Sequence, residues 1–312
     1  MKLFAAAAAA LLVTTGAYAA DLPTKKAPVV APVAFSPWDF EVGAQVTTDY
    51  LFRGITQSNH APSVWAHGEL RYNFNDMFQL YAGVSGESIK LSNVVPSPSM
   101  ELDGYGGARL TLGNFGLDVG GIYYGYPNTN TGIPGFTVPA ASNPFSPVPI
   151  SWFELYAKPS YNVTDWLSIG ANFFYTPSYL NTGAHGEYLS ATAKVTLPYG
   201  FAVSGEVGHQ WLGTTNAIWL APVAFLASNA GFTPGKLPSY TYYNVGASYT
   251  YKFVTLDIRY HGTSLSKAAA SQFTGNANAG PNLAFPGQTL STYGRAAIVG
   301  TLSFALTSKD VK

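Results

Sequence analysis

The sequence predicts an all-β transmembrane protein, an antiparallel up-and-down β-barrel of about 12 strands with short periplasmic turns and long extracellular loops. Charged residues make up only 10% of the chain and aromatic residues 15%, whereas a soluble domain is usually about 25% charged. No stretch after the first twenty residues has 18 consecutive apolar residues, which excludes helical membrane spans there. Many segments instead alternate apolar and polar residues with a period of two. A closed barrel can satisfy every backbone hydrogen bond inside a bilayer.

The N-terminal residues have the pattern of a secretory signal peptide. Lys2 gives a positive start, Leu3 to Val13 an apolar stretch, and Ala17-Tyr18-Ala19 an A-x-A cleavage site. The chain has no cysteine, so it has no disulfide framework or thiolate site. We expect export and integration into the outer membrane with both termini in the periplasm. The predicted divisions are a signal peptide (1–19), a Pro-rich periplasmic N-terminal segment (20–38), the barrel (39–306) and a C-terminal tail (307–312).

Twelve segments alternate strictly enough to be predicted as strands. In the first, Phe40, Val42, Ala44 and Val46 form one apolar face. Connections between segments are alternately short and mostly long, as in outer-membrane barrels with an even number of strands. The predicted strands are 39–54, 63–74, 78–87, 100–112, 116–126, 150–161, 166–176, 187–197, 201–212, 240–251, 254–262 and 292–306.

The charged residues decide which face points inward, because an Arg or Lys on the lipid face costs about 2–4 kcal/mol at the midplane. Only Glu187 and His209 fall on the apolar faces of the predicted strands. Aromatic residues near both strand ends predict two interfacial girdles, with Tyr50 and Phe52 in the external one. The predicted pore-lining residues are Asp49, Arg53, His67, Glu69, Arg71, Glu101, Asp103, Arg109, Asp118, Glu154, Lys158, Lys194, Asp257, Arg259 and Arg295.

The segment TDYLFRGITQ (Thr48–Gln57) places an arginine directly before a glycine. Alternation carried through it puts Asp49 and Arg53 on the lumen side, with Arg53 at the external mouth opposite Ser63 and Asp49 opposite His67. Two roles for Arg53 remain open, a filter for solutes and an anchor for a loop.

The same segment resembles the [ST]-D-Y-x-F-R-G-[IV]-[ST]-Q signature of the TorF-type porin family of proteobacterial outer-membrane proteins. Residues 101–107 (ELDGYGG) and 116–127 (GLDVGGIYYGYP) resemble that family's second hairpin, and residues 152–156 (WFELY) its next strand. The resemblance runs from about residue 40 to the end and implies a barrel with a channel role. The inserts at 127–149, 213–239 and 263–291 look longer than the family norm.

The mixed-charge interior suggests passive diffusion of small hydrophilic solutes or ions. Acids and bases there either pair as structural links or separate into a transverse field that orients a solute. The inward tyrosines Tyr81, Tyr105, Tyr124, Tyr156 and Tyr242 either fill space or form a stacking path. One or more long loops folding inward would narrow the pore.

Two other functions remain as alternatives, a structural or adhesive barrel without channel activity and a lipid-modifying enzyme. The sequence offers no serine near His209, and the histidines lack metal-ligand spacing, so we expect no catalytic site, metal site or cofactor. Near-neutral charge argues against a nucleic-acid partner. Expected partners are outer-membrane lipid and lipopolysaccharide, the barrel assembly machinery, periplasmic chaperones and the solutes themselves.

Overall fold

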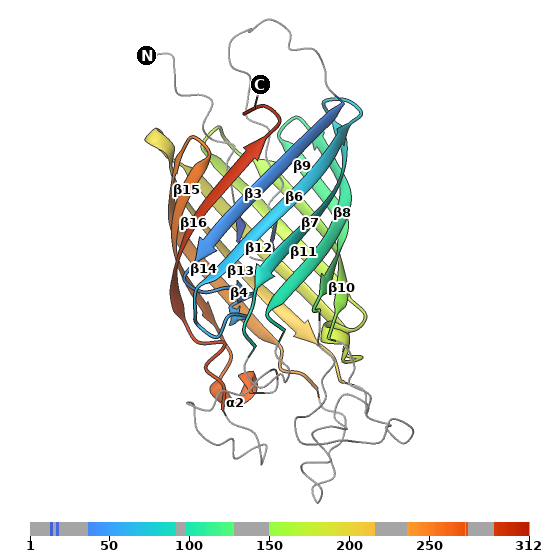
Figure 1. Ribbon diagram of the computed structural model, residues 1–312, viewed down its shortest axis with the longest axis vertical. Coiled ribbons are helices and arrows are strands. Elements are labelled where there is room, and N and C mark those ends of the chain that lie inside the picture. Colours follow the sequence, from blue (N-terminus) through green and yellow to red (C-terminus); the bar gives the residue numbers. More distant parts are fainter. Residues whose placement is uncertain are drawn as a thin grey trace, which may run out of the picture.

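Twelve antiparallel strands close into a barrel in the computed structural model, which confirms the predicted fold class (Figure 1). The structure describes residues 13–14, 17–18, 37–91, 98–127, 150–215, 236–271, 273 and 290–311. Each barrel strand pairs with its neighbours in sequence, and the last pairs with the first to close the sheet. The strands are β3 (Trp38–Thr47), β6 (Ser63–Asn73), β7 (Phe78–Ser88), β8 (Met100–Leu112), β9 (Phe115–Gly125), β10 (Trp152–Asn162), β11 (Leu167–Thr176), β12 (Gly186–Thr196), β13 (Phe201–Leu212), β14 (Tyr240–Tyr251), β15 (Val254–Thr263) and β16 (Ala297–Thr307).

Several short elements lie outside the barrel sheet. They are the strand pairs β1 (Val13–Thr14) with β2 (Ala17–Tyr18) and β4 (Leu51–Phe52) with β5 (Ile55–Thr56), and the helices η1 (Tyr179–Asn181), η2 (Pro198–Gly200) and α2 (Lys267–Ala270). No helix in the described ranges is long and apolar enough to span a bilayer. Most of the predicted signal peptide and Pro-rich segment lies outside the described residues.

The two ends of the barrel differ in their connections. β3 begins and β16 ends at the same end, which also carries the short turns, such as residues 113–114 between β8 and β9 (Figure 1). The long connections lie at the opposite end, called here the long-loop end. This asymmetry matches the predicted alternation of short and long connections.

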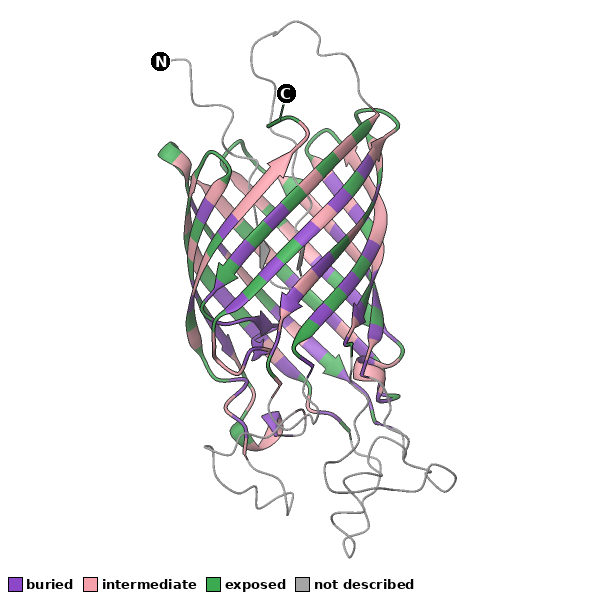
Figure 2. Cartoon of the chain, in the orientation of Figure 1, coloured by how far each residue is buried: buried purple, intermediate pink, exposed green. Residues whose placement is uncertain are grey.

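Burial alternates along much of the barrel sheet, so one face points outward and the other into the barrel (Figure 2). Val64, Val84 and Ile258 are more than half exposed on the outside. Their exposure confirms the predicted parity. At the short-turn end the rings of Tyr72, Phe74 and Phe78 contact one another at 4.8 and 5.3 Å between centroids, as an interfacial girdle requires.

The predicted first strand is wrong at its C-terminal end. β3 stops at Thr47, and the chain then turns into the barrel as the hairpin β4–β5 instead of continuing to residue 54. Tyr50 and Phe52, expected to face lipid, are 5% and 7% exposed inside the barrel. Alternation cannot detect this, because a packed interior and a lipid surface both select apolar aromatic side chains.

The pairing predicted for this segment is wrong for the same reason. Thr47 lies opposite Ser63, and Gly43 lies opposite His67, so neither Arg53 nor Asp49 is part of the barrel ladder. The last strand begins at Ala297 rather than at residue 292.

Substitutions on the outer face test whether that surface is solvated by lipid. Ile258 lies in the middle of β15, whereas Val254 starts the same strand on the same face at the short-turn end. We expect Ile258→Arg to lower the free energy of unfolding in lipid vesicles by about 2–4 kcal/mol and Val254→Arg by about 0–1 kcal/mol. Urea titration followed by tryptophan fluorescence measures both. Equal costs at the two depths would contradict a membrane-spanning barrel.

Candidate functional site in the barrel interior

The inward hairpin is built around a two-residue turn, Phe52-Arg53-Gly54-Ile55. Leu51 pairs with Thr56 and Phe52 with Ile55. Arg53 has φ 46° and Gly54 φ 82°, and positive φ at both central positions defines the tight hairpin turns of type I′. The sequence motif Arg53-Gly54 therefore marks the tip of a hairpin.

Gly54 is required by contact as well as by conformation. A Cβ atom at this position would lie 2.4 Å from Thr263 Cγ2 and 2.8 Å from Tyr242 Cδ2. The tip of the hairpin thus touches the wall formed by β14 and β15. Any other residue would push it away from that wall.

Arg53 holds the tip against another part of the interior wall. Its Nη1 and Nη2 atoms donate to Glu154 Oε1 and Oε2 at 2.9 and 2.7 Å, a bidentate charge-assisted pair. Nη1 also donates to Gln210 Oε1 at 2.6 Å. The guanidinium lies over the rings of Phe174 and Tyr188, with its Cζ atom 4.8 and 4.4 Å from their centroids. Through these contacts one side chain reaches β10, β11, β12 and β13.

The base of the hairpin is held by a second set of polar contacts. Asp49 Oδ1 accepts hydrogen bonds from Thr56 Oγ1 at 2.5 Å and Ser58 Oγ at 3.0 Å, and Asp49 Oδ2 lies 2.8 Å from His60 Nδ1. Tyr50 donates its hydroxyl to Glu101 on β8 at 2.8 Å. The inward hairpin, residues 48–60, is therefore a packed element that crosses the barrel in its long-loop half.

The short-turn half contains paired charges on neighbouring strands. Arg71 Nη2 lies 2.6 Å from Glu41 and its Nε also bonds Glu69. Arg109 donates from Nη1 and Nη2 to the two carboxylate oxygens of Glu69 at 2.8 and 3.0 Å, and its Nε lies 3.5 Å from Asp118 Oδ2. These five residues, here called the wall network, link β3, β6, β8 and β9.

Other predicted pore-lining residues lie on the interior faces of their strands. Arg259 contacts Asp257 at 3.0 Å and Asn244 at 2.6 Å. The Nζ atom of Lys158 lies 4.0 Å from the ring centroid of Tyr156. Elsewhere, His67 contacts Glu41, Lys194 is half-buried on β12, and Glu101 and Asp103 are buried on β8.

Three predicted pore-lining residues do not lie on the barrel wall. Asp49 and Arg53 are inside the barrel but belong to the inward hairpin. Arg295 is exposed in the bend before β16, so the strand position predicted for it is wrong. The prediction missed Gln210 and Tyr188, although strict alternation on β12 and β13 would have placed both inward.

His209 is the residue on which the enzymatic alternative depends. It is directed to the outer face, its Nδ1 lies 3.0 Å from Thr241 Oγ1, and its ring packs on Trp211 at 4.6 Å. The neighbouring hydroxyl belongs to a threonine of the adjacent strand β14. The geometry is that of an interfacial anchor.

A family model described as "Bacterial protein of unknown function (Gcw_chp)" matches residues 31–278, which is more than half of the chain. The chain belongs to this family. No curated protein matches the sequence.

Among solved structures, the NanC porin is similar at 8% identity and TM-score 0.42, covering 87% of this chain and 98% of that one. The toluene transporter TodX of Pseudomonas putida is similar at 11% identity and TM-score 0.42, covering 87% and 90%. LpxR from Salmonella typhimurium is similar at 11% identity and TM-score 0.38, covering 85% and 99%. These likenesses are too distant to bear on function.

Because Arg53 and Glu154 form a buried ion pair, we expect substitutions at the two positions to have large and non-additive effects on the free energy of unfolding. Glu154→Gln or Arg53→Met leaves one buried charge without its partner, so either should lower the free energy of unfolding by about 3–5 kcal/mol. The double variant Arg53→Met with Glu154→Gln should cost less than the two single costs added together. Arg295→Met is the matched control at an exposed arginine, with an expected change within about 0.5 kcal/mol. Additive costs would show that the pair is not formed.

We expect the hairpin to stay packed inside the barrel only when residue 54 is glycine. The chain has no cysteine, so Ile55→Cys introduces a single reporter at a position that is 6% exposed. We expect this thiol to react slowly with a water-soluble maleimide when residue 54 is glycine. Adding Gly54→Val should expose it and speed the labelling, because the Cβ atom displaces the tip. Equal rates would show that the hairpin tolerates a side chain there.

Proposed function

We propose that this chain is a porin-like outer-membrane channel for passive diffusion of small hydrophilic solutes or ions, narrowed by its inward hairpin. The observation that carries the proposal is the interior itself, which is lined with charged and hydrogen-bonding side chains from β3 round to β15. A barrel serving only as a membrane anchor has no need of so many buried charges, each costly to desolvate.

The dimensions are consistent with a restricted path. Twelve strands enclose more space than the eight-stranded barrels whose side chains fill the interior, and less than the 16 to 18 strands of general porins. The inward hairpin occupies part of that space at the long-loop end. The channel is therefore expected to pass only small solutes.

Orientation follows from the general plan of outer-membrane barrels, in which short turns and both termini face the periplasm. The hairpin then lies toward the cell exterior. The resemblance of residues 48–57 to the TorF-type signature supports a channel of this kind, with outer-membrane lipid, lipopolysaccharide and the assembly machinery as its partners.

Planar-bilayer recording tests the channel. We expect discrete but small current steps from the native chain. Glu154→Gln, which releases the tip of the hairpin, should raise the conductance or its noise by about two-fold or more if the hairpin sets the constriction. Arg295→Met, at an exposed arginine in the bend before β16, should leave the steps unchanged.

One outcome would overturn the proposal in favour of a closed barrel. The packed hairpin, with Arg53 and Thr56 4% and 0% exposed, is the observation that favours this alternative. Folded protein that gives no current steps, even as Glu154→Gln, would show that the barrel is plugged and would favour the alternatives without channel activity.

A further inference from the structure

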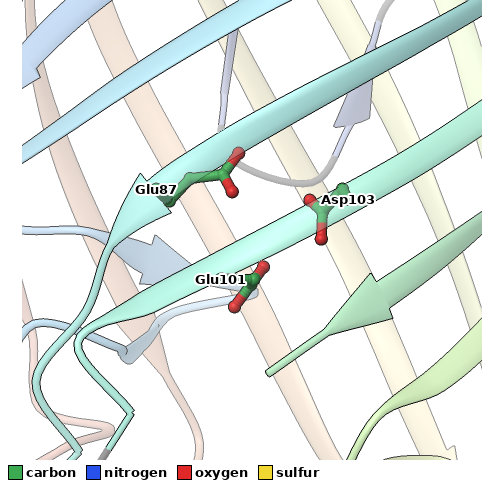
Figure 3. Close-up of side chains that lie close together, drawn as sticks. All are labelled: Glu87, Glu101 and Asp103. Carbon is green, nitrogen blue, oxygen red and sulfur yellow. The ribbon is translucent and has the colours of Figure 1, made fainter. Parts of the chain in front are cut away.

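Three carboxylates gather inside the barrel near its long-loop end. Glu87 lies on β7, and Glu101 and Asp103 lie on β8, and each offers an oxygen atom within 4.8 Å of the others (Figure 3). Glu87 is directly opposite Glu101 in the strand pairing, and Asp103 is opposite Ser85. Like charges directly opposite one another destabilise a sheet, so the fold bears a cost at this place.

Five other carboxylates of the interior differ from these three in having a cationic partner. Glu41, Glu69, Asp118, Glu154 and Asp257 each lie beside an arginine. Within the described ranges, no Lys, Arg or His side chain forms an ion pair with Glu87, Glu101 or Asp103. A buried charge is normally paired or bound to a metal.

Two of the acids also have an oxygen atom with no partner. Glu87 Oε2 and Asp103 Oδ1 are buried and accept no hydrogen bond, in residues that are 5% and 7% exposed. Ser85 Oγ donates to the other oxygen of Asp103 at 3.4 Å, and Tyr50 donates to Glu101. The carboxylates are thus held by neutral donors while unsatisfied oxygens remain. Such buried, unsatisfied acceptors commonly mark a bound ion.

We propose that Glu87, Glu101 and Asp103 bind one calcium ion. Carboxylate oxygens are the ligands of hard divalent cations, and two ligands about 2.4 Å from the same Ca²⁺ can be at most about 4.8 Å apart. The oxygen atoms lie within this limit. Ca²⁺ also accepts irregular coordination by six to eight oxygens, whereas Mg²⁺ demands near-ideal octahedral geometry. Water and the Ser85 hydroxyl are available to complete the coordination.

The prediction of no metal site rested on histidine spacing, whereas this cluster is made only of oxygen ligands from two paired strands. Its position also gives it a consequence for the hairpin. The Tyr50 hydroxyl that donates to Glu101 belongs to the base of the inward hairpin. A calcium ion therefore joins β7, β8 and the hairpin base in one cluster.

Calcium binding is tested by isothermal titration of the folded chain in detergent micelles free of lipopolysaccharide, after removal of metal with EDTA. We expect one Ca²⁺ per native chain, and a loss of affinity of at least about ten-fold in Glu87→Gln and in Asp103→Asn. Glu206→Gln is the matched control, because Glu206 is also an interior acid but accepts from the neutral Tyr188 hydroxyl at 2.8 Å. It should bind calcium like the native chain.

Thermal unfolding gives a second readout that a purely structural role would not move. Calcium should raise the unfolding temperature of the native chain and of Glu206→Gln but not of Asp103→Asn. In EDTA, Asp103→Asn should be at least as stable as the native chain, because one of three repelling charges is gone. Native protein that binds no calcium, or variants that bind it equally well, would overturn the proposal. Both measurements are independent of channel activity.

Discussion

The interior of this barrel depends on the buried ion pair between Arg53 and Glu154. An arginine cannot give up its proton, so once the inward hairpin enters the barrel its guanidinium needs a carboxylate waiting on the wall. Glu154 supplies one in bidentate geometry, and the Phe174 and Tyr188 rings cover the planar faces. Burying either charge without its partner would cost much of the free energy of folding. The hairpin is consequently docked as a unit or not at all, which makes it a discrete element rather than a loosely packed loop.

The rest of the interior divides by how its charges are neutralised. In the wall network, arginines lie beside acids, so that Arg71 on the same strand and Arg109 on β8 share Glu69 between them. Charges paired this closely cancel within a few ångströms, which makes them structural links rather than the source of a transverse field. Glu87, Glu101 and Asp103, here called the acid triad, are the opposite case, because these carboxylates form no ion pair with a cation of the described residues. The triad therefore adds unpaired negative charge to the interior at the long-loop end.

The sequence predicts the barrel well because lipid enforces the pattern. An outward charge is expensive in the central part of a membrane strand, so the sequence alone shows which face of each strand from β6 to β15 points outward. The inward hairpin escaped prediction because Tyr50 and Phe52 continue the apolar pattern of Val42 and Val46. One signal was present: a strand over 39–54 is longer than the roughly 9–11 residues that cross a bilayer. Arg295 was misplaced through a similarly long last strand. The partnership of Arg53 with Glu154 joins residues 101 positions apart, and no local pattern encodes it.

Hairpin and triad lie at the same end of the barrel, and on the proposed function they together determine what an entering solute meets. The Arg53–Glu154 pair is neutral as a whole, so the hairpin tip obstructs without selecting by charge. The triad, in contrast, is three acids with no cation of the described chain to balance them, and it attracts positive ions into a site of low dielectric. Bound calcium removes most of that negative charge and at the same time ties the hairpin base to the wall through Tyr50 and Glu101. On the proposed function, one ion therefore alters the electrostatics of the mouth and the anchoring of its obstruction together, because both depend on the carboxylate of Glu101.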